Sequence, residues 1–148
     1  MKNKKGKNKI AIVSSSFRDD VSSELEKRCV ATLLRRGIKK GNIEKYRVPG
    51  ALEIPLVVGK LATSRRYGAI IAFGAIIKGD TYHFEQVADE CVRGCMDASW
   101  RYGVPVIYEV LAVYRLKDAL DRATRKTENK GVEAAETALE MMDLLQRL

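Results

Sequence analysis

The sequence predicts an α/β protein with three layers, in which helices cover both faces of a central, mainly parallel four-stranded sheet. Four short apolar runs alternate along the chain with segments whose apolar residues recur at helical spacing. This alternation is typical of a parallel sheet with crossover helices. Residues 69–77 are apolar at nearly every position, as in a strand that is buried on both faces. The length of 148 residues fits one domain.

The first strand and the first helix are predicted near the amino end of the chain. Residues 10–13 form a short apolar run typical of a buried strand, and a polar loop follows it. From position 21 onward, apolar residues recur at roughly helical spacing. Asp19 or Asp20 can cap this helix, and Gly37 can end it.

Turn residues separate the second strand from the second helix. Residues 42–48 predict the strand, and Pro49-Gly50 breaks it. The helix is expected over residues 53–66. Pro55 lies in its first turn, where the missing N–H group has no helical partner to lose.

The rest of the chain continues the alternation after the long apolar run. We expect a helix from about Phe84 to Tyr102, a fourth strand over residues 104–111 and a short helix over residues 116–125. A polar interruption that ends at Gly131 precedes a last helix with inward-facing apolar residues. The sequence shows no internal repeat and no second domain.

Basic residues are concentrated at the amino end. Much of the net charge of +8 comes from five lysines among the first nine residues, which are Lys2, Lys4, Lys5, Lys7 and Lys9. We expect a disordered basic tail over residues 1–8 and a single domain over residues 9–148. An electrostatic arm for nucleic acid is the alternative. No aromatic residue lies among these lysines to stack on bases, so we favour a solvated tail and expect no nucleic-acid partner.

The composition also bears on compartment and on metals. No apolar run reaches the ~20 residues that span a bilayer, and the charged amino end lacks the apolar core of a secretory signal. We therefore expect a cytoplasmic protein without a membrane partner. Cys29, Cys91 and Cys95 are an odd number without a disulfide pattern. The last two could hold a metal, but we favour small buried side chains on one helix face and expect no metal.

Ligands of such folds bind in the crevice outside the carboxyl ends of the strands. This rule directs attention to the four strand ends, which are residues 14–18, 48–53, 74–83 and 108–114.

The loop after the long apolar strand is the most informative of these segments. Gly79 permits a ligand to approach the backbone closely. Asp80 and Thr81 precede a helix whose N–H groups and dipole favour an anion such as phosphate, although either residue could equally cap that helix. His83, the only histidine, can give or take a proton near neutral pH. A structural or solvated histidine is the alternative for this position.

Four further residues each allow two interpretations. Phe17 could stack on a planar ring or pack on a neighbouring side chain. Glu53 could accept hydrogen bonds from ligand hydroxyls or cap its own helix. Arg122 and Lys130 could pair with phosphate or be solvated surface residues.

Four segments, taken together and in this order, resemble the 6,7-dimethyl-8-ribityllumazine synthase family, which catalyses the penultimate step of riboflavin biosynthesis. They are VPGALEIP at 48–55, GAIIKGDTYH at 74–83, GVPVI at 103–107 and NKGVE at 129–133, and the resemblance runs from about Lys9 to Leu148. It implies a flavodoxin-like fold and a transferase without metal or organic cofactor. The implied reaction condenses 5-amino-6-(D-ribitylamino)uracil with 3,4-dihydroxy-2-butanone 4-phosphate. An imine forms, phosphate leaves, and ring closure yields the lumazine.

The resemblance also implies roles for residues at matching positions. His83 would be the proton donor and acceptor, and Phe17 would stack on the uracil ring. Lys130 and Glu133 would supply supporting charges. The other residues implied to bind the ribitylaminouracil are Ala51, Leu52, Glu53, Ala75, Ile76, Ile77 and Tyr108, and those implied to bind the butanone phosphate are Asp80, Thr81 and Arg122.

The resemblance further implies a homo-oligomer. Members of the family form pentamers, some of which assemble as twelve pentamers into a hollow icosahedral capsid of 60 subunits. Tyr108 would reach the uracil pocket from a neighbouring subunit. The short link before Asn129 resembles that of capsid-forming members.

Five positions depart from the family pattern. Arg18 stands where asparagine is usual, Leu52 replaces a common aromatic residue, and Lys78 replaces a common arginine. Glu109 adds an acid next to the tyrosine of the fourth strand, and Thr124 replaces a glycine. Two other functions stay open at this point. One is a flavin- or ribityl-ligand-binding protein without catalysis, which would not need the histidine, and the other is an RNA-binding module that uses the lysine tail.

Overall fold

The computed structural model of the chain describes residues 8–148 and contains one sheet of four parallel strands. The strands are β1 (Lys9–Ser15), β2 (Ile43–Val48), β3 (Tyr67–Ile77) and β4 (Val106–Val113). The helices are α1 (Asp19–Arg35), α2 (Ile54–Thr63), α3 (His83–Tyr102), α4 (Leu116–Thr124) and α5 (Lys130–Arg147), with short 3₁₀ helices η2 (Lys40–Asn42) and η3 (Ala51–Glu53). The predicted α/β fold is confirmed.

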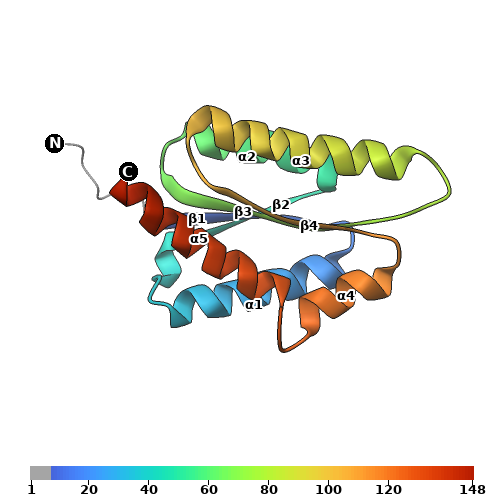
Figure 1. Cartoon of the computed structure of the whole chain (residues 1–148), viewed down its shortest axis with the longest axis horizontal. Helices are drawn as coiled ribbons and strands as arrows, with labels where there is room; N and C mark the ends of the chain where they lie inside the picture. The colour runs from blue at the N-terminus through green and yellow to red at the C-terminus, as the bar shows by residue number, and fades with distance from the viewer. Residues whose placement is uncertain (1–7) are drawn as a thin grey trace.

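The sheet has the strand order β2-β1-β3-β4. The chain first moves from β1 to β2 at one edge and then crosses to β3 on the other side of β1. Helices α2 and α3 cover one face of the sheet, while α1, α4 and α5 cover the other (Figure 1). The direction of winding therefore changes between β1 and β3, which is where such sheets bind ligands.

The core consists of two apolar layers, one on each side of the sheet. In β1, Ile10 and Ile12 pack against α1 and α5, whereas Ala11 and Val13 pack toward α2 and α3. Strand β3 is buried at every position except its last, Ile77, because it is central and covered on both faces. The prediction of a doubly covered strand is confirmed.

Helices α1 and α5 approach each other closely at Gly131. A Cβ atom at this position would lie 2.4 Å from the carbonyl oxygen of Leu25, so a larger residue would force the two helices apart. Asn129 caps α5 just before this contact, and its side-chain oxygen accepts hydrogen bonds from the backbone N–H groups of Gly131 and Val132.

Three local predictions need correction. The residue before α1 is Arg18 in the left-handed conformation (φ 61°), so Asp19 and Asp20 are not caps but lie in the first turn, where the helix dipole favours carboxylates. The residue before α3 is Tyr82, and no side chain caps this helix, so the capping interpretation of Asp80 and Thr81 is wrong. His83 begins α3 rather than ending a loop.

The predicted basic tail falls almost entirely on residues 1–7, which lie outside the described residues. Lys9, the first residue of the predicted domain, begins β1, and its Nζ atom lies 3.0 Å from Oε1 of Glu44. None of the helices between residues 8 and 148 is both long and apolar enough to cross a membrane.

Candidate active site

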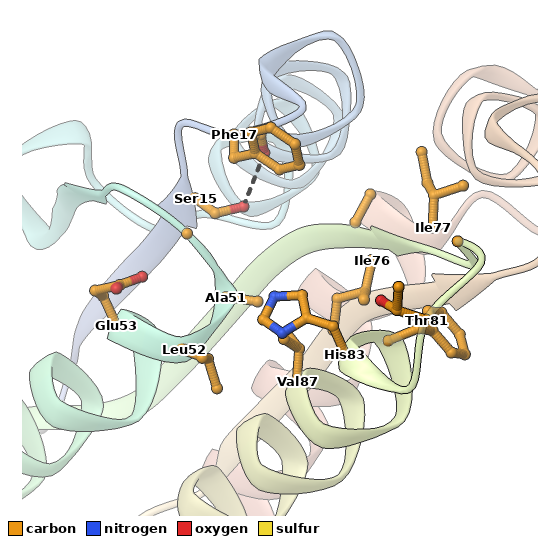
Figure 2. Close-up of a pocket in the computed structure, with 14 residues that line it drawn as sticks. Ser15, Phe17, Ala51, Leu52, Glu53, Ile76, Ile77, Thr81, His83 and Val87 are labelled. Atoms are coloured by element: carbon orange, nitrogen blue, oxygen red, sulfur yellow. Dashed lines mark hydrogen bonds between the residues drawn. The ribbon is translucent and has the colours of Figure 1, made fainter.

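A pocket of about 340 Å³ opens at the carboxyl edge of the sheet. Its walls come from the ends of β1 and β3, from the η3 segment after β2 and from the start of α3 (Figure 2). The residues that line it are Ser15, Phe17, Gly50, Ala51, Leu52, Glu53, Ala75, Ile76, Ile77, Gly79, Thr81, His83, Phe84 and Val87. A pocket of this size holds a small organic molecule.

The floor of the pocket is formed where β1 and β3 lie side by side. Ser15 ends β1, and its hydroxyl lies close to Gly74 of β3. A Cβ atom at position 74 would be 2.7 Å from Oγ of Ser15 and 3.3 Å from a methyl group of Val110. Glycine at this position therefore lets the two strand ends come together beneath the pocket.

Phe17 stands on a tight turn between β1 and α1. The backbone N–H groups of Ser16 and Phe17 donate to the carbonyl oxygens of Val48 and Pro49 at 2.7 and 2.9 Å, so the turn is attached to the end of β2. The side chain of Phe17 is 71% exposed and lines the pocket (Figure 2). It has an aromatic face that is not covered by the core, which suits stacking on a planar ligand.

The segment after β2 forms the wall opposite α3. Pro49-Gly50 ends the strand, and the single turn η3 then presents Ala51, Leu52 and Glu53 to the pocket. Glu53 makes no capping hydrogen bond to α2, so the capping interpretation of this residue is wrong. Its exposed carboxylate is left available to accept hydrogen bonds from ligand hydroxyls.

His83 occupies the first position of α3 at the rim of the pocket. Figure 2 shows its imidazole ring pointing from the start of the helix toward Ala51 and Leu52. Val87 lies one helical turn later and lines the same pocket beneath the ring. The imidazole is exposed rather than part of the core, so it can exchange protons with a bound molecule.

A pair of opposite charges lies beside the start of α3. Nζ of Lys78 contacts Oε1 of Glu85, and this hydrogen bond is the main reason that the pKa of Glu85 lies below its usual range. The same ammonium group lies 5.4 Å from the ring centroid of Phe84, a cation–π contact. Lys78 therefore contacts both Glu85 and Phe84, and the latter lines the pocket.

Five residues predicted for the site do not line this pocket. Asp80 is exposed in the loop between β3 and α3. Tyr108 is half-buried on β4, beside α3, where burial and the nearby Cys91 thiol raise its pKa. Arg122 on α4 and the pair Lys130–Glu133 on α5 lie on the opposite face of the sheet.

Lys130 and Glu133 form a small charged cluster with Glu109 of β4. Nζ of Lys130 lies 2.7 Å from Oε2 of Glu133, and the half-buried Glu109 of β4 is close enough to interact with both. Burial raises the pKa of Glu109 to about 7; the Lys130 ammonium opposes this rise and the Glu133 carboxylate adds to it. Arg122 donates from Nη1 to the carbonyl oxygen of Asp118 at 2.9 Å.

Gly79, which the sequence singled out for close approach of a ligand, lines the pocket, and four other lining residues were not predicted, namely Ser15, Gly50, Phe84 and Val87. A periodicity signal could have found Val87, because it lies four positions after His83 on the same helix face. Ser15 ends the first strand, so the rule for carboxyl ends already pointed to its segment. The three cysteines are free and buried, and no three His, Cys, Asp or Glu side chains of residues 8–148 gather as metal ligands.

The position of the pocket defines the class of protein. It lies at the carboxyl edge of a parallel sheet, at the point where the winding changes direction, and it brings an imidazole, a carboxylate and an aromatic ring to one small cavity. Such an arrangement is typical of α/β enzymes that act on small organic molecules.

Comparison with known proteins narrows this class to one family. Residues 7–146 match the family model described as 6,7-dimethyl-8-ribityllumazine synthase. A protein with that name from Syntrophus aciditrophicus (strain SB) is 44% identical over 140 residues, which cover 95% of this chain and 91% of the relative. The chain therefore belongs to the 6,7-dimethyl-8-ribityllumazine synthase family and is an enzyme of riboflavin biosynthesis.

Proposed function

We propose that the chain condenses 5-amino-6-(D-ribitylamino)uracil with 3,4-dihydroxy-2-butanone 4-phosphate to give 6,7-dimethyl-8-ribityllumazine, phosphate and water. The observation that carries this proposal is the position of His83, whose imidazole shares one pocket with Phe17 and Glu53. Within this cavity Phe17 suits a planar ring and Glu53 suits a polyhydroxyl chain, while His83 is the group that can transfer protons.

The acid–base role falls to His83. Formation of the imine, loss of phosphate and ring closure each move a proton between nitrogen, carbon or oxygen atoms. An exposed imidazole can give and take such protons near neutral pH. The remaining acceleration comes from holding the two reactants side by side in the pocket, which removes the entropy cost of their encounter.

The ribitylaminouracil is held by the walls of the pocket. Phe17 stacks on the uracil ring, and Glu53 accepts hydrogen bonds from the ribityl hydroxyls. Ala51 and Leu52 also hold this substrate, and Ala75, Ile76 and Ile77 line the same pocket through their backbone. Support for this arrangement is that all seven residues line one cavity although they come from three separate segments of the chain.

The butanone phosphate lies nearer to the start of α3. Thr81 lines the pocket there, and Asp80 precedes it in the same loop. The uncapped first turn of α3 directs backbone N–H groups and the positive end of the helix dipole toward this point, which favours a phosphate group. A cation from a second subunit, Arg122, completes the neutralisation of the departing phosphate.

A homo-oligomer follows from this proposal, because Tyr108, Arg122, Lys130 and Glu133 can serve the pocket only from another copy of the chain. We propose the pentamer of the family, with a capsid of twelve pentamers as a further step. An exposed apolar stripe on α3 supports association, because Val92, Met96 and Trp100 recur every four residues and Trp100 is 91% exposed. Leu52 of η3 and Leu56 of α2 are further exposed apolar residues.

The decisive experiment mixes the purified protein with both substrates and follows lumazine absorbance together with released phosphate. We expect the two products to appear in equal amounts, and neither when one substrate is omitted. Binding of the lumazine without turnover would instead support a ligand-binding protein without catalysis. Neither binding nor turnover would reject the proposed reaction.

A second experiment tests the contribution of the neighbouring subunit. Arg122→Ala should raise the KM for the butanone phosphate, because a cation that faces the phosphate is lost. The KM for the ribitylaminouracil should stay unchanged. Sedimentation of the wild-type protein measures the assembly, and a monomer with full activity would contradict the shared site.

A further inference from the structure

Arg47 connects the strand at one edge of the sheet to the beginning of α1. Its Nη1 atom donates to Oδ1 of Asp19 at 2.6 Å, and its Nη2 atom donates to Oε2 of Glu26 at 2.7 Å. The same guanidinium contacts Oγ of Ser23 at 3.2 Å and the carbonyl oxygen of Ser15 at 3.5 Å. One side chain therefore contacts both the last residue of β1 and the first two turns of α1.

The local sequence explains this geometry. Residues of β2 alternate between the two faces of the sheet, and Lys45 and Arg47 fall on the face that α1 covers. Asp19, Ser23 and Glu26 share one side of α1 because they are four and three residues apart. Arginine suits the position since its planar fork can reach two carboxylates at once.

The carboxylate of Glu26 is nearly buried and therefore depends on its contact with Arg47. The side chain of Glu26 is only 11% exposed, and a carboxylate at such a site needs a compensating charge. Lys45 is the second cation near it, with Nζ at 3.9 Å from Oε1. Arg47 supplies the shorter, hydrogen-bonded partner and also extends to Asp19, which Lys45 does not contact.

The turn that carries Phe17 lies between the two points that Arg47 contacts. Ser15 precedes this turn and Asp19 follows it, while Ser16 and Phe17 donate to the carbonyl oxygens of Val48 and Pro49 on the other side. The turn also contains Arg18 at φ 61°, a conformation that non-glycine residues adopt at an energetic cost. Other interactions must therefore offset this cost, and the guanidinium of Arg47 contacts both ends of the turn.

We propose that Arg47 is a positioning residue for the ring-binding wall of the pocket, because it fixes the turn that presents Phe17 without touching the ligand itself. This inference rests on the proposed function only for the identity of the ring that Phe17 faces. It predicts an effect that is confined to one of the two substrates, since the phosphate end of the pocket lies at the start of α3.

The test compares Arg47→Met with the matched control Lys45→Met. Both remove a cation from the same face of β2 and from the neighbourhood of Glu26, but only the first loosens the turn. We expect Arg47→Met to raise the KM for the ribitylaminouracil and the Kd for 6,7-dimethyl-8-ribityllumazine, measured by fluorescence titration, by roughly tenfold, as small losses of alignment do. The KM for the butanone phosphate should stay the same. Lys45→Met should change none of these values.

Two further variants separate positioning from general stability. In a Phe17→Ala background, Arg47→Met should leave the lumazine Kd almost unchanged, because the side chain through which Arg47 acts is absent. Arg47→Lys should restore part of the affinity, since an ammonium can reach one carboxylate but not both. If Arg47→Met does not fold, Asp19→Asn removes one contact of the guanidinium and should weaken lumazine binding in the same direction by a smaller factor.

Amide hydrogen exchange tests the geometry without any substrate. Arg47→Met should speed amide exchange, measured by NMR, at Ser16 and Phe17. The reference is the set of other backbone amides that make hydrogen bonds in loops at the carboxyl edge. A wild-type protein that neither binds nor forms the lumazine would reject the proposed function and leave this exchange result to decide the inference. Unchanged exchange at both amides in Arg47→Met would overturn the positioning role. So would a lower kcat in this variant with the KM values for both substrates unchanged.

Discussion

The polar side chains at the two edges of the sheet have different environments. At the amino edge, where β1, β2 and β3 begin, hydrogen bonds join the polar side chains of Lys9, Glu44, Tyr46 and Tyr67. At the carboxyl edge, where these strands end, Phe17, Glu53 and His83 face a cavity. The same strands therefore supply a closed polar network at one end and an open binding site at the other.

Glu44 is the centre of the network at the amino edge. Tyr67 and Tyr46 donate hydroxyl hydrogen bonds to its Oε2 atom, and Nζ of Lys9 donates to Oε1 at 3.0 Å. These bonds, that from Tyr67 first, lower the pKa of Glu44 to about 2. Arg66 adds a guanidinium that donates to the Tyr67 hydroxyl at 2.8 Å.

This difference shows where stability and function lie in the molecule. Polar groups that are paired inside the protein hold the strands in register and have little left to offer a ligand. Exposed groups around a cavity add little to stability and are available for chemistry. Changes at the carboxyl edge should therefore alter the reaction, while changes at the amino edge should alter the free energy of unfolding.

The largest expected effect is the loss of reaction rate in His83→Ala. Removal of a general acid–base group lowers kcat by roughly 10²–10⁴-fold, while the melting temperature should stay the same because the ring is exposed. Lumazine absorbance measures the rate and calorimetry the stability. Gln86→Ala, on the same helix but outside the pocket, is the control. A variant that retains wild-type kcat would assign the proton transfer to another group.

Tyr67→Phe should lower stability and leave the reaction rate unchanged, which is the opposite of the effect of His83→Ala. It removes the hydroxyl that links Glu44 to Arg66 from a residue that is only 3% exposed, and should lower the free energy of unfolding by about 1–2 kcal/mol. Chemical denaturation measures the change, and lumazine formation at 25 °C should be unaffected. Tyr102→Phe, whose hydroxyl lies outside this network, controls for loss of a phenol. An active-site defect in Tyr67→Phe would show that the two edges are not independent.

The acid dependence of stability sharpens the same comparison. Glu44 has a pKa of about 2 in the folded protein and an ordinary value of 4.5 in the unfolded chain. It therefore stabilises the fold above pH 4.5 and loses this contribution as the pH falls toward 2. The side chain is 26% exposed, and solvent screening limits the contribution to about 1 kcal/mol. Glu44→Gln should be less stable than wild type at pH 6, and the gap should close near pH 2. A constant gap in urea titrations across this range would contradict the assignment.

The smallest expected effect is a gain of stability at the carboxyl edge. Arg18 adopts a left-handed conformation, and asparagine tolerates this region better than arginine. Arg18→Asn should therefore raise the free energy of unfolding by about 0.5 kcal/mol, although it also removes the exposed ion pair with Asp20. Calorimetry measures the shift, and Arg18→Ala, which keeps the strain but loses the ion pair, should be less stable than wild type.

The sequence by itself determined the elements and part of the site. Apolar periodicity placed all four strands and the main helices, because it depends on neighbours only a few residues apart. It also singled out His83, Glu53 and Phe17, since each follows a strand end or begins a helix. It was wrong about the caps of α1 and α3. Arg18 and Tyr82 hold the capping positions without a side-chain bond, in place of the predicted acidic residues and Thr81.

The tertiary structure alone decided the strand order, the closure of the pocket and the partners of the charged residues. The order β2-β1-β3-β4 brings Ser15 beside Gly74, and no local pattern encodes that approach. It also places Arg47 across the Phe17 turn and moves Arg122 to the opposite face of the sheet. The physical reason is range: side-chain periodicity is set within a few residues, whereas these contacts join residues that are distant along the chain and meet only when the sheet is assembled.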